Sequence, residues 1–179
     1  MGIRFDKEGF EAAKSEAVAD FVAEHLPGKT VLDAFTGIGG SAIGFARAGK
    51  KVISVEIIAE RSKMAQHNAG IYKVANRINF IVGDTMKLWK KFDFDSAYFD
   101  PPWGGVGYEK RGLLTFDSFN PNVLPLIKKL VARGKHVAVT LPLNFNFYEL
   151  NRVPKKPRLY FNEQSGKLYC VHSFWLAND

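Results

Sequence analysis

The chain has 179 residues, of which 46% are hydrophobic, so it can bury a core and is too apolar to be disordered. Its 25 basic and 18 acidic residues leave a net charge of +7, which favours an anionic partner such as nucleic acid. Its single cysteine, Cys170, excludes an internal disulfide, and no apolar run is long enough to span a bilayer. We expect one domain over residues 1–179, in the cytoplasm, or in the nucleus of a eukaryote.

Apolar residues at helical spacing predict a first helix over residues 14–25. Short runs rich in β-branched residues then alternate with further helical stretches. In chain order the predicted strands are 30–35, 51–56, 77–82, 96–99 and 136–141, and the predicted helices between them are 41–47, 59–72, 85–89 and 123–133. Residues 157–162 and 168–176, joined by a turn, predict a terminal β-hairpin.

The alternation of strands and helices predicts right-handed crossovers and therefore a parallel sheet. The terminal hairpin adds an antiparallel strand. The predicted fold class is α/β, a Rossmann-like, doubly wound and mostly parallel seven-stranded sheet with a terminal antiparallel hairpin. In such a sheet, ligands bind at the carboxyl ends of the strands.

Residues 33–40, D-A-F-T-G-I-G-G, follow the first predicted strand. Glycines at a strand-to-helix turn allow a ligand to approach the backbone closely. Gly37, Gly39 and Ala42 also fit the dinucleotide pattern G-x-G-x-x-A, which alone is a weak signal, and a tight turn that binds nothing is the structural alternative. Asp33 favours another ligand, because its carboxylate would repel a pyrophosphate but can hold a cationic amino-acid group.

Two more acids end the next two predicted strands. Glu56 lies 19 residues after Gly37, where an acid accepts hydrogen bonds from both ribose hydroxyls of a nucleoside. Asp84 follows the third strand and has two equally weighted interpretations, a contact with the adenine amine or the N-cap of the next short helix. Together with Asp33, these acids predict a nucleoside that carries an amino-acid tail, as S-adenosylmethionine does.

Residues 99–105 read F-D-P-P-W-G-G directly after the fourth strand. Residues 33–40 together with 101–105 resemble the trimethylguanosine synthase family, the RNA cap guanine-N2 methyltransferases. Residues 2–10 are similar to the segment that leads into that catalytic domain, and the resemblance extends to about Trp175. It implies a class I methyltransferase that uses S-adenosylmethionine to methylate the exocyclic N2 amine of a guanine in RNA, with Trp103 stacked on the purine.

The chemistry agrees with this resemblance, because the lone pair of a guanine amine is delocalised into the ring. Asp100 and the carbonyl of Pro101 are suitable acceptors for the amine hydrogens, and the proline rings hold that carbonyl rigidly. A core tryptophan is the structural alternative for Trp103. The expected catalytic residues are Asp100, Pro101, Pro102 and Trp103. The expected cofactor contacts are Asp33, Phe35, Thr36, Gly37, Gly39, Glu56 and Asp84.

Basic residues suggest where RNA phosphates bind. Lys110 and Arg111 follow the glycines, and a second cluster, residues 152–158, precedes the hairpin; both are expected on the rim formed by the strand ends. Residues 145, 147 and 148 are aromatic, and at least two of them are expected in the core. The expected substrate contacts are Trp103, Lys110, Arg111, Asn144, Lys155 and Lys156.

Three alternatives remain open. The first keeps the cofactor but moves the methyl to adenine N6 or another amine, in rRNA, tRNA or a small molecule. The second is a methyltransferase-like domain that binds RNA without catalysis, against which the intact acids argue. The third is an NAD-dependent dehydrogenase, for which no hydride-handling residues are evident. The four histidines lack metal-ligand spacing, so no metal is expected.

Overall fold

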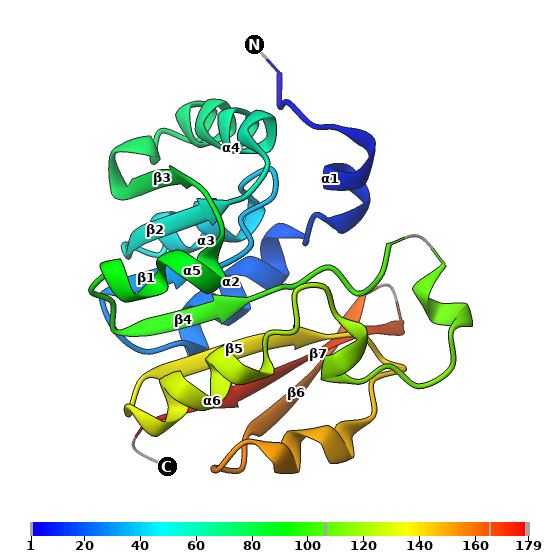
Figure 1. Cartoon of the computed structure of the whole chain (residues 1–179). Coiled ribbons are helices and arrows are strands. Elements are labelled where there is room, and N and C mark those ends of the chain that lie inside the picture. The colour runs from blue at the N-terminus through cyan, green and yellow to red at the C-terminus, as the bar shows by residue number, and fades with distance from the viewer. Residues whose placement is uncertain (1, 106, 165, 178–179) are drawn as a thin grey trace. The chain divides into compact units, whose positions relative to one another are not determined.

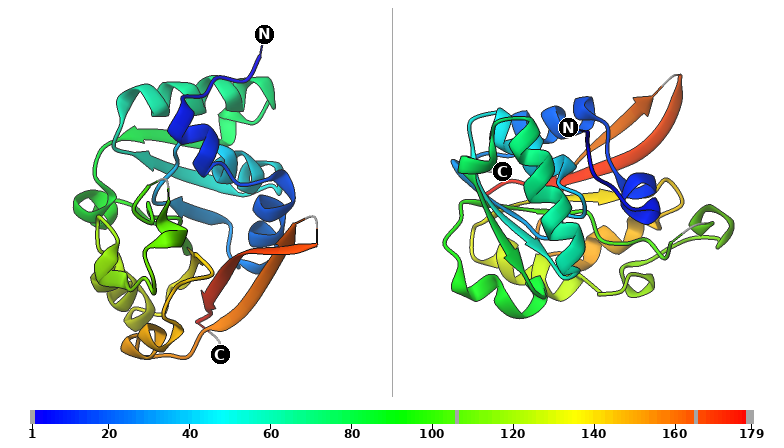
Figure 2. Two further views of the ribbon diagram at one scale, coloured as in Figure 1. Left: turned by 90° about the vertical axis from the view of Figure 1, so that its right-hand side faces the viewer. Right: turned by 90° about the horizontal axis from the view of Figure 1, so that it is seen from above.

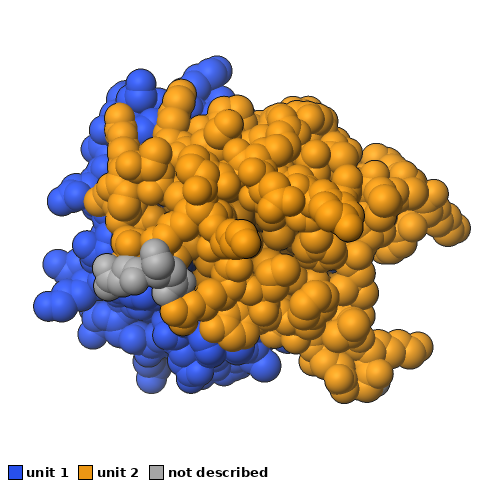
Figure 3. Space-filling model, turned by 90° about the horizontal axis from the view of Figure 1, so that it is seen from below, with its two compact units in different colours: residues 1–98 blue, residues 99–179 orange. Residues whose placement is uncertain are grey.

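The structure is a computed structural model that describes residues 2–105, 107–164 and 166–177. The chain separates into two compact units, residues 1–98 and residues 99–179 (Figure 3). We call them the first unit and the second unit. The expectation of a single domain over residues 1–179 stays a prediction.

The first unit contains a parallel sheet. β1 (Thr30–Asp33) pairs with β2 (Lys51–Glu56) on one side and with β4 (Ser96–Phe99) on the other, and β2 also pairs with β3 (Ile78–Val82). All these pairs are parallel, so the carboxyl ends of the strands share one edge. The acids predicted to bind the cofactor therefore come from neighbouring strands.

Helices connect these strands as expected. They are α2 (Glu16–His25), α3 (Gly40–Arg47), α4 (Ala59–Ile71) and α5 (Thr85–Leu88), with the 3₁₀ turns η1 (Ala75–Arg77) and η2 (Trp89–Lys91). α2 and α3 pack so closely that a Cβ on Gly44 would lie only 2.5 Å from the Cβ of Ala19. Glycine at this position therefore lets the two helices approach.

A short helix that the sequence did not predict, α1 (Lys7–Ala12), precedes α2. Asp6 caps it by accepting the N–H of Gly9 at 2.7 Å, and Arg61 of α4 donates to the same carboxylate at 2.8 Å. Although burial opposes it, the Arg61 guanidinium and the Gly9 N–H hold the pKa of Asp6 below its ordinary value. Arg61, 55 residues away along the chain, thus helps to fix α1. The sequence did not predict α1 because the helix is too short to show a periodic pattern.

The second unit contains β5 (His136–Leu141) and the hairpin of β6 (Arg158–Gln164) and β7 (Lys167–Trp175). β7 runs antiparallel to both β5 and β6, and Figure 2 shows the twisted hairpin. α6 (Leu124–Ala132) buries its apolar side, and the 3₁₀ turns are η3 (Tyr108–Lys110), η4 (Phe116–Ser118) and η5 (Phe147–Arg152). The predicted terminal hairpin is confirmed.

The strand order is β3-β2-β1-β4-β5-β7-β6 (Figure 1). This confirms the predicted fold, a mostly parallel seven-stranded α/β sheet of the class I methyltransferase type with an antiparallel hairpin. β2, β4 and β5 begin and end at the predicted residues. Within the described part of the chain, no helix has the length and apolar character needed to cross a membrane.

Candidate active site

The glycine-rich turn between β1 and α3 contains two glycines with positive φ, Gly37 at 55° and Gly39 at 98°. No atom lies within 4 Å of the position that a Cβ on Gly37 would occupy, so this backbone faces open space. A Cβ on Gly39 would instead lie 3.0 Å from the Cβ of Ala65 in α4. Gly37 therefore leaves room for a ligand, whereas Gly39 is required by the packing of α4.

Glu56 ends β2 and is only 8% exposed. Its Oε2 accepts the N–H of Gly37 at 2.7 Å, and its Oε1 accepts the N–H of Ile58 at 2.9 Å. These two bonds fix the carboxylate beside the open backbone of Gly37. Because each carboxylate oxygen has a second lone pair, Glu56 keeps the capacity to accept from ribose hydroxyls.

Asp33 is fully buried at the carboxyl end of β1, and Phe35 is half-buried in the turn that follows. Thr36 is also buried, and its hydroxyl lies 2.8 Å from the hydroxyl of Ser54. The N–H of Thr36 donates to the carbonyl of Val55 at 3.1 Å. Thr36 thus ties the turn to β2 through both its side chain and its backbone N–H, and its expected part in cofactor binding stays a prediction.

Asp84 is the N-cap of α5, where its Oδ1 accepts the N–H of Met86 at 2.9 Å. The neighbouring Thr85 donates its hydroxyl to the carbonyl of Ala34 at 2.8 Å, which ties α5 to the glycine-rich turn. Of the two interpretations of Asp84, the capping role is confirmed. The contact with adenine stays a prediction.

Residues 100–103 follow β4 and belong to the second unit. Asp100 is half-buried, Pro101 is buried and Pro102 is exposed. Trp103 is only 9% exposed, and its indole N–H donates to the carbonyl of Thr140 in β5 at 3.3 Å. Tyr108 packs against Trp103 in an edge contact, with ring centroids 5.1 Å apart and planes at 74°. Trp103 is thus anchored on β5 and contacts a second aromatic residue, Tyr108, that no sequence pattern marked.

The segment that carries Tyr108 is held at both ends by Asn144, which follows β5. The Nδ2 of Asn144 donates to the carbonyls of Tyr108 at 3.1 Å and Gly112 at 2.8 Å. These two acceptors fix the orientation of the amide, whose Oδ1 is buried and accepts no hydrogen bond from the described residues. Asn144 therefore positions the segment and directs a spare acceptor into the interior.

The guanidinium of Arg111 lies against Gly104, because a Cβ on that glycine would be 2.5 Å from the Nη1 of Arg111. Lys110 is exposed in the same turn, η3. The structure thus brings the predicted substrate contacts Arg111 and Asn144 to the segment that carries Tyr108.

Replacing Tyr108 by alanine is expected to expose Trp103 to solvent. Quenching of tryptophan fluorescence by acrylamide should increase, because the other two tryptophans, Trp89 and Trp175, are 6% and 1% exposed and lie outside this contact. The same change in a Trp103→Phe background is the control and should leave quenching unaltered. An equal increase in both backgrounds would mean that Tyr108→Ala loosens the whole chain.

The expected position of Lys155 and Lys156 on the rim formed by the carboxyl ends of the strands is wrong. The ammonium of Lys155 donates to the carbonyl of Ala177 at 3.0 Å, and the N–H of Ala177 donates to His136, the first residue of β5, at 3.0 Å. Both β5 and β6 run antiparallel to β7, so they are parallel to each other. The chain must therefore return to the amino end of β5 before β6 begins, and Lys155 and Lys156 precede β6 directly.

Arg152, in the same predicted cluster, is engaged within the second unit. Its Nη1 lies 2.8 Å from Asp117 and 2.6 Å from Glu149. The hydrogen bond from Arg152 lowers the pKa of Asp117 below its ordinary value. Arg152 is therefore committed to protein carboxylates.

The aromatic residues after β5 divide between core and surface. Phe145 is buried, with its ring centroid 5.0 Å from that of Phe116 and 5.7 Å from that of Phe119. Phe147 is half-buried against Phe145, whereas Tyr148 is 84% exposed. The expectation that at least two of the three belong to the core is wrong, because only Phe145 is buried and Phe147 lies at the edge of the core.

A family model described as "RNA cap guanine-N2 methyltransferase" matches residues 28–170. The chain belongs to this family. Trimethylguanosine synthase of Schizosaccharomyces pombe is 32% identical over 187 aligned residues, which cover 96% of this chain and 78% of that protein. The family and this relative confirm the predicted function, an S-adenosylmethionine-dependent RNA guanine-N2 methyltransferase.

Solved structures confirm the fold of this methyltransferase. A crystal structure of a putative methyltransferase from Porphyromonas gingivalis W83 has a TM-score of 0.79 at 19% identity and covers 97% of this chain and 43% of that chain. An RNA methyltransferase from Salinibacter ruber, solved with S-adenosyl-L-homocysteine, has a TM-score of 0.62 at 18% identity and covers 90% and 91% of the two chains. S-adenosylmethionine is the methyl donor of the family.

Proposed function

We propose that this methyltransferase acts on the guanine of an RNA 5′ cap, with the first unit supplying the cofactor contacts and the second unit the acceptor contacts. One observation carries this assignment. In the parallel register of β1 and β4, Asp33 lies beside Tyr98, and Asp100 follows Tyr98 by two residues. Both motifs thus leave neighbouring parallel strands at their carboxyl ends, where ligands of such sheets bind.

The residues of the first unit suit an adenosyl amino acid. The open backbone at Gly37 gives the ligand room, and the Glu56 carboxylate beside it can accept from ribose hydroxyls. Asp33 supplies a negative charge for the ammonium of the amino-acid tail. When bound, S-adenosylmethionine supplies an electrophilic methyl group on a positively charged sulfur.

In the second unit, residues 100–103 handle the acceptor amine. Asp100 and the carbonyl of Pro101 accept its two hydrogens, which leaves the nitrogen lone pair directed toward the methyl group. Once the methyl group has passed from sulfur to nitrogen, with the electron pair of the broken C–S bond left on the sulfur, Asp100 would take the proton that the nitrogen loses. Rigid acceptors need no rearrangement during the reaction, so positioning and electrostatics carry most of the rate enhancement.

Trp103 supplies the stacking face once Tyr108 moves away from it. Stacking of a base on an aromatic side chain contributes about 1–3 kcal/mol, and a guanine methylated at N7 adds about 0.5–2 kcal/mol of cation–π attraction. Lys110 and Arg111, in the turn beside Gly104, carry charges that suit the phosphates of a cap. A cationic base followed by a polyphosphate meets both requirements, which favours the cap over an internal guanine.

The direct test is transfer of a radiolabelled methyl group to three substrates. They are a short RNA whose cap is methylated at guanine N7, the same RNA without its cap, and an RNA that lacks guanine. We expect label on the cap, with mass spectrometry of the digest placing the methyl on guanine N2. Label on internal guanine alone would contradict the proposal that the cap is the substrate. Label on adenine would contradict the proposed acceptor altogether.

Replacing Asp100 by alanine is expected to lower kcat by about 100-fold or more, since it removes the acceptor for the amine proton. The Kd of S-adenosylhomocysteine should change little, because Asp100 contacts the acceptor rather than the cofactor. Glu109→Ala, which removes one exposed carboxylate from the nearby turn, is the matched control. A parallel fall in kcat and cofactor affinity would assign Asp100 to cofactor binding instead.

A further inference from the structure

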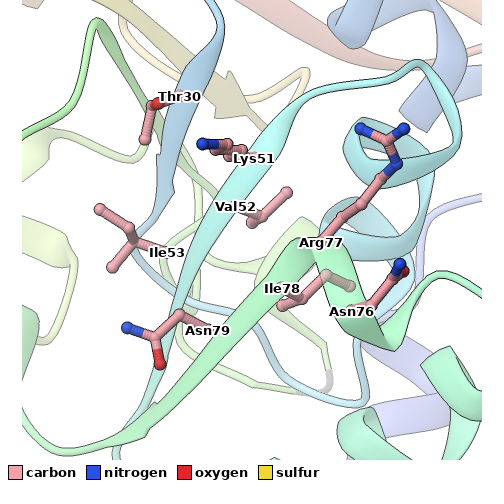
Figure 4. Close-up of a pocket in the computed structure, with 8 residues that line it drawn as sticks. All are labelled: Thr30, Lys51, Val52, Ile53, Asn76, Arg77, Ile78 and Asn79. Carbon is pink, nitrogen blue, oxygen red and sulfur yellow. The ribbon is translucent and has the colours of Figure 1, made fainter.

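A hollow of about 470 Å³ lies in the first unit, at the end of the strands opposite to the glycine-rich turn (Figure 4). Its lining includes Thr30, Lys51 and Ile78, which are the first residues of β1, β2 and β3. Glu56 lies five positions after Lys51 along β2, or about 17 Å at the usual rise of a strand. The hollow is therefore separate from the predicted cofactor contacts, none of which lines it.

One side of the hollow is a face of the sheet. Thr30 pairs with Lys51, and Ile53 pairs with Asn79, so these four side chains share a face. Figure 4 shows them along one side of β2, whereas the side chains of Asn76 and Arg77 extend from the other side. Val52 and Ile78 pair with each other on the opposite face and are buried there, at 2% and 7% exposed. On the face of the hollow the apolar side chain is the half-buried Ile53, so the hollow is mainly polar.

The border is basic and rich in hydrogen-bond donors. Lys51 and Arg77 line it, and no carboxylate does. Neither cation has an ion pair with a described residue, although Arg77 donates one N–H to the carbonyl of Gly49 at 3.1 Å. The amides of Asn76 and Asn79 hydrogen-bond to no described residue. Donors and positive charge around a surface hollow suit a ligand with several anionic oxygens.

We propose that this hollow binds the sugar–phosphate backbone of the RNA substrate, at nucleotides beyond the guanine that is methylated. This inference rests on the proposed function. Lys51 and Arg77 neutralise phosphates, and Asn76 and Asn79 donate to phosphate or ribose oxygens. The side chain of Ile53 contacts a ribose or base edge. A cap nucleotide alone is too short to fill this site and the carboxyl end of the sheet together.

The arrangement favours RNA over other anionic or protein ligands. A small anion is gripped by donors that converge on one point, but here the two cations flank the hollow from different sides (Figure 4). A protein partner would need an exposed apolar centre, whereas the face of the hollow offers the single half-buried apolar side chain of Ile53. A polyanion with regularly spaced charges fits two separated cations, and the net charge of +7 favours it further.

The test is the double variant Lys51→Ala/Arg77→Ala, compared with Lys63→Glu. Both lower the net charge by two, but Lys63 lies on α4, is 70% exposed and does not line the hollow. Binding of an uncapped single-stranded RNA is measured at several salt concentrations. The double variant should make the slope of log K against log salt shallower by about 1.4, since each lost phosphate contact contributes about 0.7. Lys63→Glu should leave the slope within about 0.3 of the wild type.

Methylation kinetics provide the second measurement. The double variant should raise KM for a long capped RNA by about fivefold or more, which follows from the loss of two phosphate contacts, and leave kcat/KM for a cap dinucleotide unchanged. An unchanged salt slope, or an equal loss on the dinucleotide, would overturn the inference. Unchanged affinity for S-adenosylhomocysteine shows that the Lys51→Ala/Arg77→Ala variant is folded. If that affinity falls, the same measurements are made on Lys51→Gln/Arg77→Gln. If the wild type methylates no cap, the proposed function fails, while the salt slope still decides the role of the hollow.

Discussion

Replacing Asp33 by asparagine is expected to weaken S-adenosylmethionine binding by about 10- to 150-fold. Asparagine keeps the shape of the side chain but removes the charge that holds the ammonium of the amino-acid tail. Hydrogen bonds to charged groups contribute about 1.5–3 kcal/mol, which corresponds to this range. The effect is large because Asp33 is fully buried, and a charge in the low-dielectric interior attracts the ammonium more strongly than one surrounded by water. Isothermal titration calorimetry measures the Kd directly.

A matched control separates charge from stability in this experiment. Asp93→Asn removes one carboxylate from an exposed position of the same unit and should leave the Kd unchanged. Thermal unfolding of Asp33→Asn without ligand then shows whether the buried position tolerates the amide. If Asp33→Asn binds S-adenosylmethionine as tightly as the wild type, Asp33 does not hold the ammonium and the assignment of the first unit as the cofactor-binding half is wrong.

The sequence predicted the acids of the first unit because their positions follow from local patterns. Strands such as β2 are short apolar runs, and the residue that ends such a run in a parallel sheet lies at the ligand-binding edge. Asp33 and Glu56 could therefore be placed without knowledge of any long-range contact. The pairing of Glu56 with the Gly37 N–H, at 2.7 Å, agrees with the spacing that selected both residues.

The position of Lys155 and Lys156 could not be predicted in the same way. A hairpin signal shows that β6 and β7 are antiparallel to each other, but it leaves open which of them pairs with β5. The structure places β7 beside β5, so the segment before β6 lies at the amino end of β5. The choice of neighbour depends on tertiary packing, which residues 152–158 do not encode locally.

The contact between Tyr108 and Trp103 was missed for a related reason. Double prolines and glycines around Trp103 indicated an open platform, and they argued against a helix or strand interior. The indole is nonetheless only 9% exposed, and Tyr108, on a segment held by Asn144, makes an edge contact with it. Those contacts join residues up to 36 positions apart, and no local pattern marks Tyr108 as a partner.

Replacing Trp103 by phenylalanine is expected to weaken binding of a cap dinucleotide by about 2- to 10-fold, because the smaller ring keeps only part of the 1–3 kcal/mol of stacking that alanine would remove. S-adenosylhomocysteine should bind as tightly as before. Phenylalanine is preferred to alanine as the first variant, because truncating a tryptophan that is only 9% exposed costs about 3–5 kcal/mol of stability. Fluorescence titration with each ligand separates the two affinities.

Trp89→Phe is the control for this experiment, since Trp89 is a tryptophan of the first unit that is only 6% exposed and lies outside residues 100–103. It should lower the free energy of unfolding and leave the cap affinity unchanged. The selectivity of the effect carries the argument: a stacking platform affects the acceptor alone, whereas a core residue affects every ligand through the stability of the fold. Should Trp103→Phe reduce the cap and cofactor affinities by the same factor, the hydrogen bond from Trp103 to Thr140 would be its main role, and another residue would have to hold the guanine.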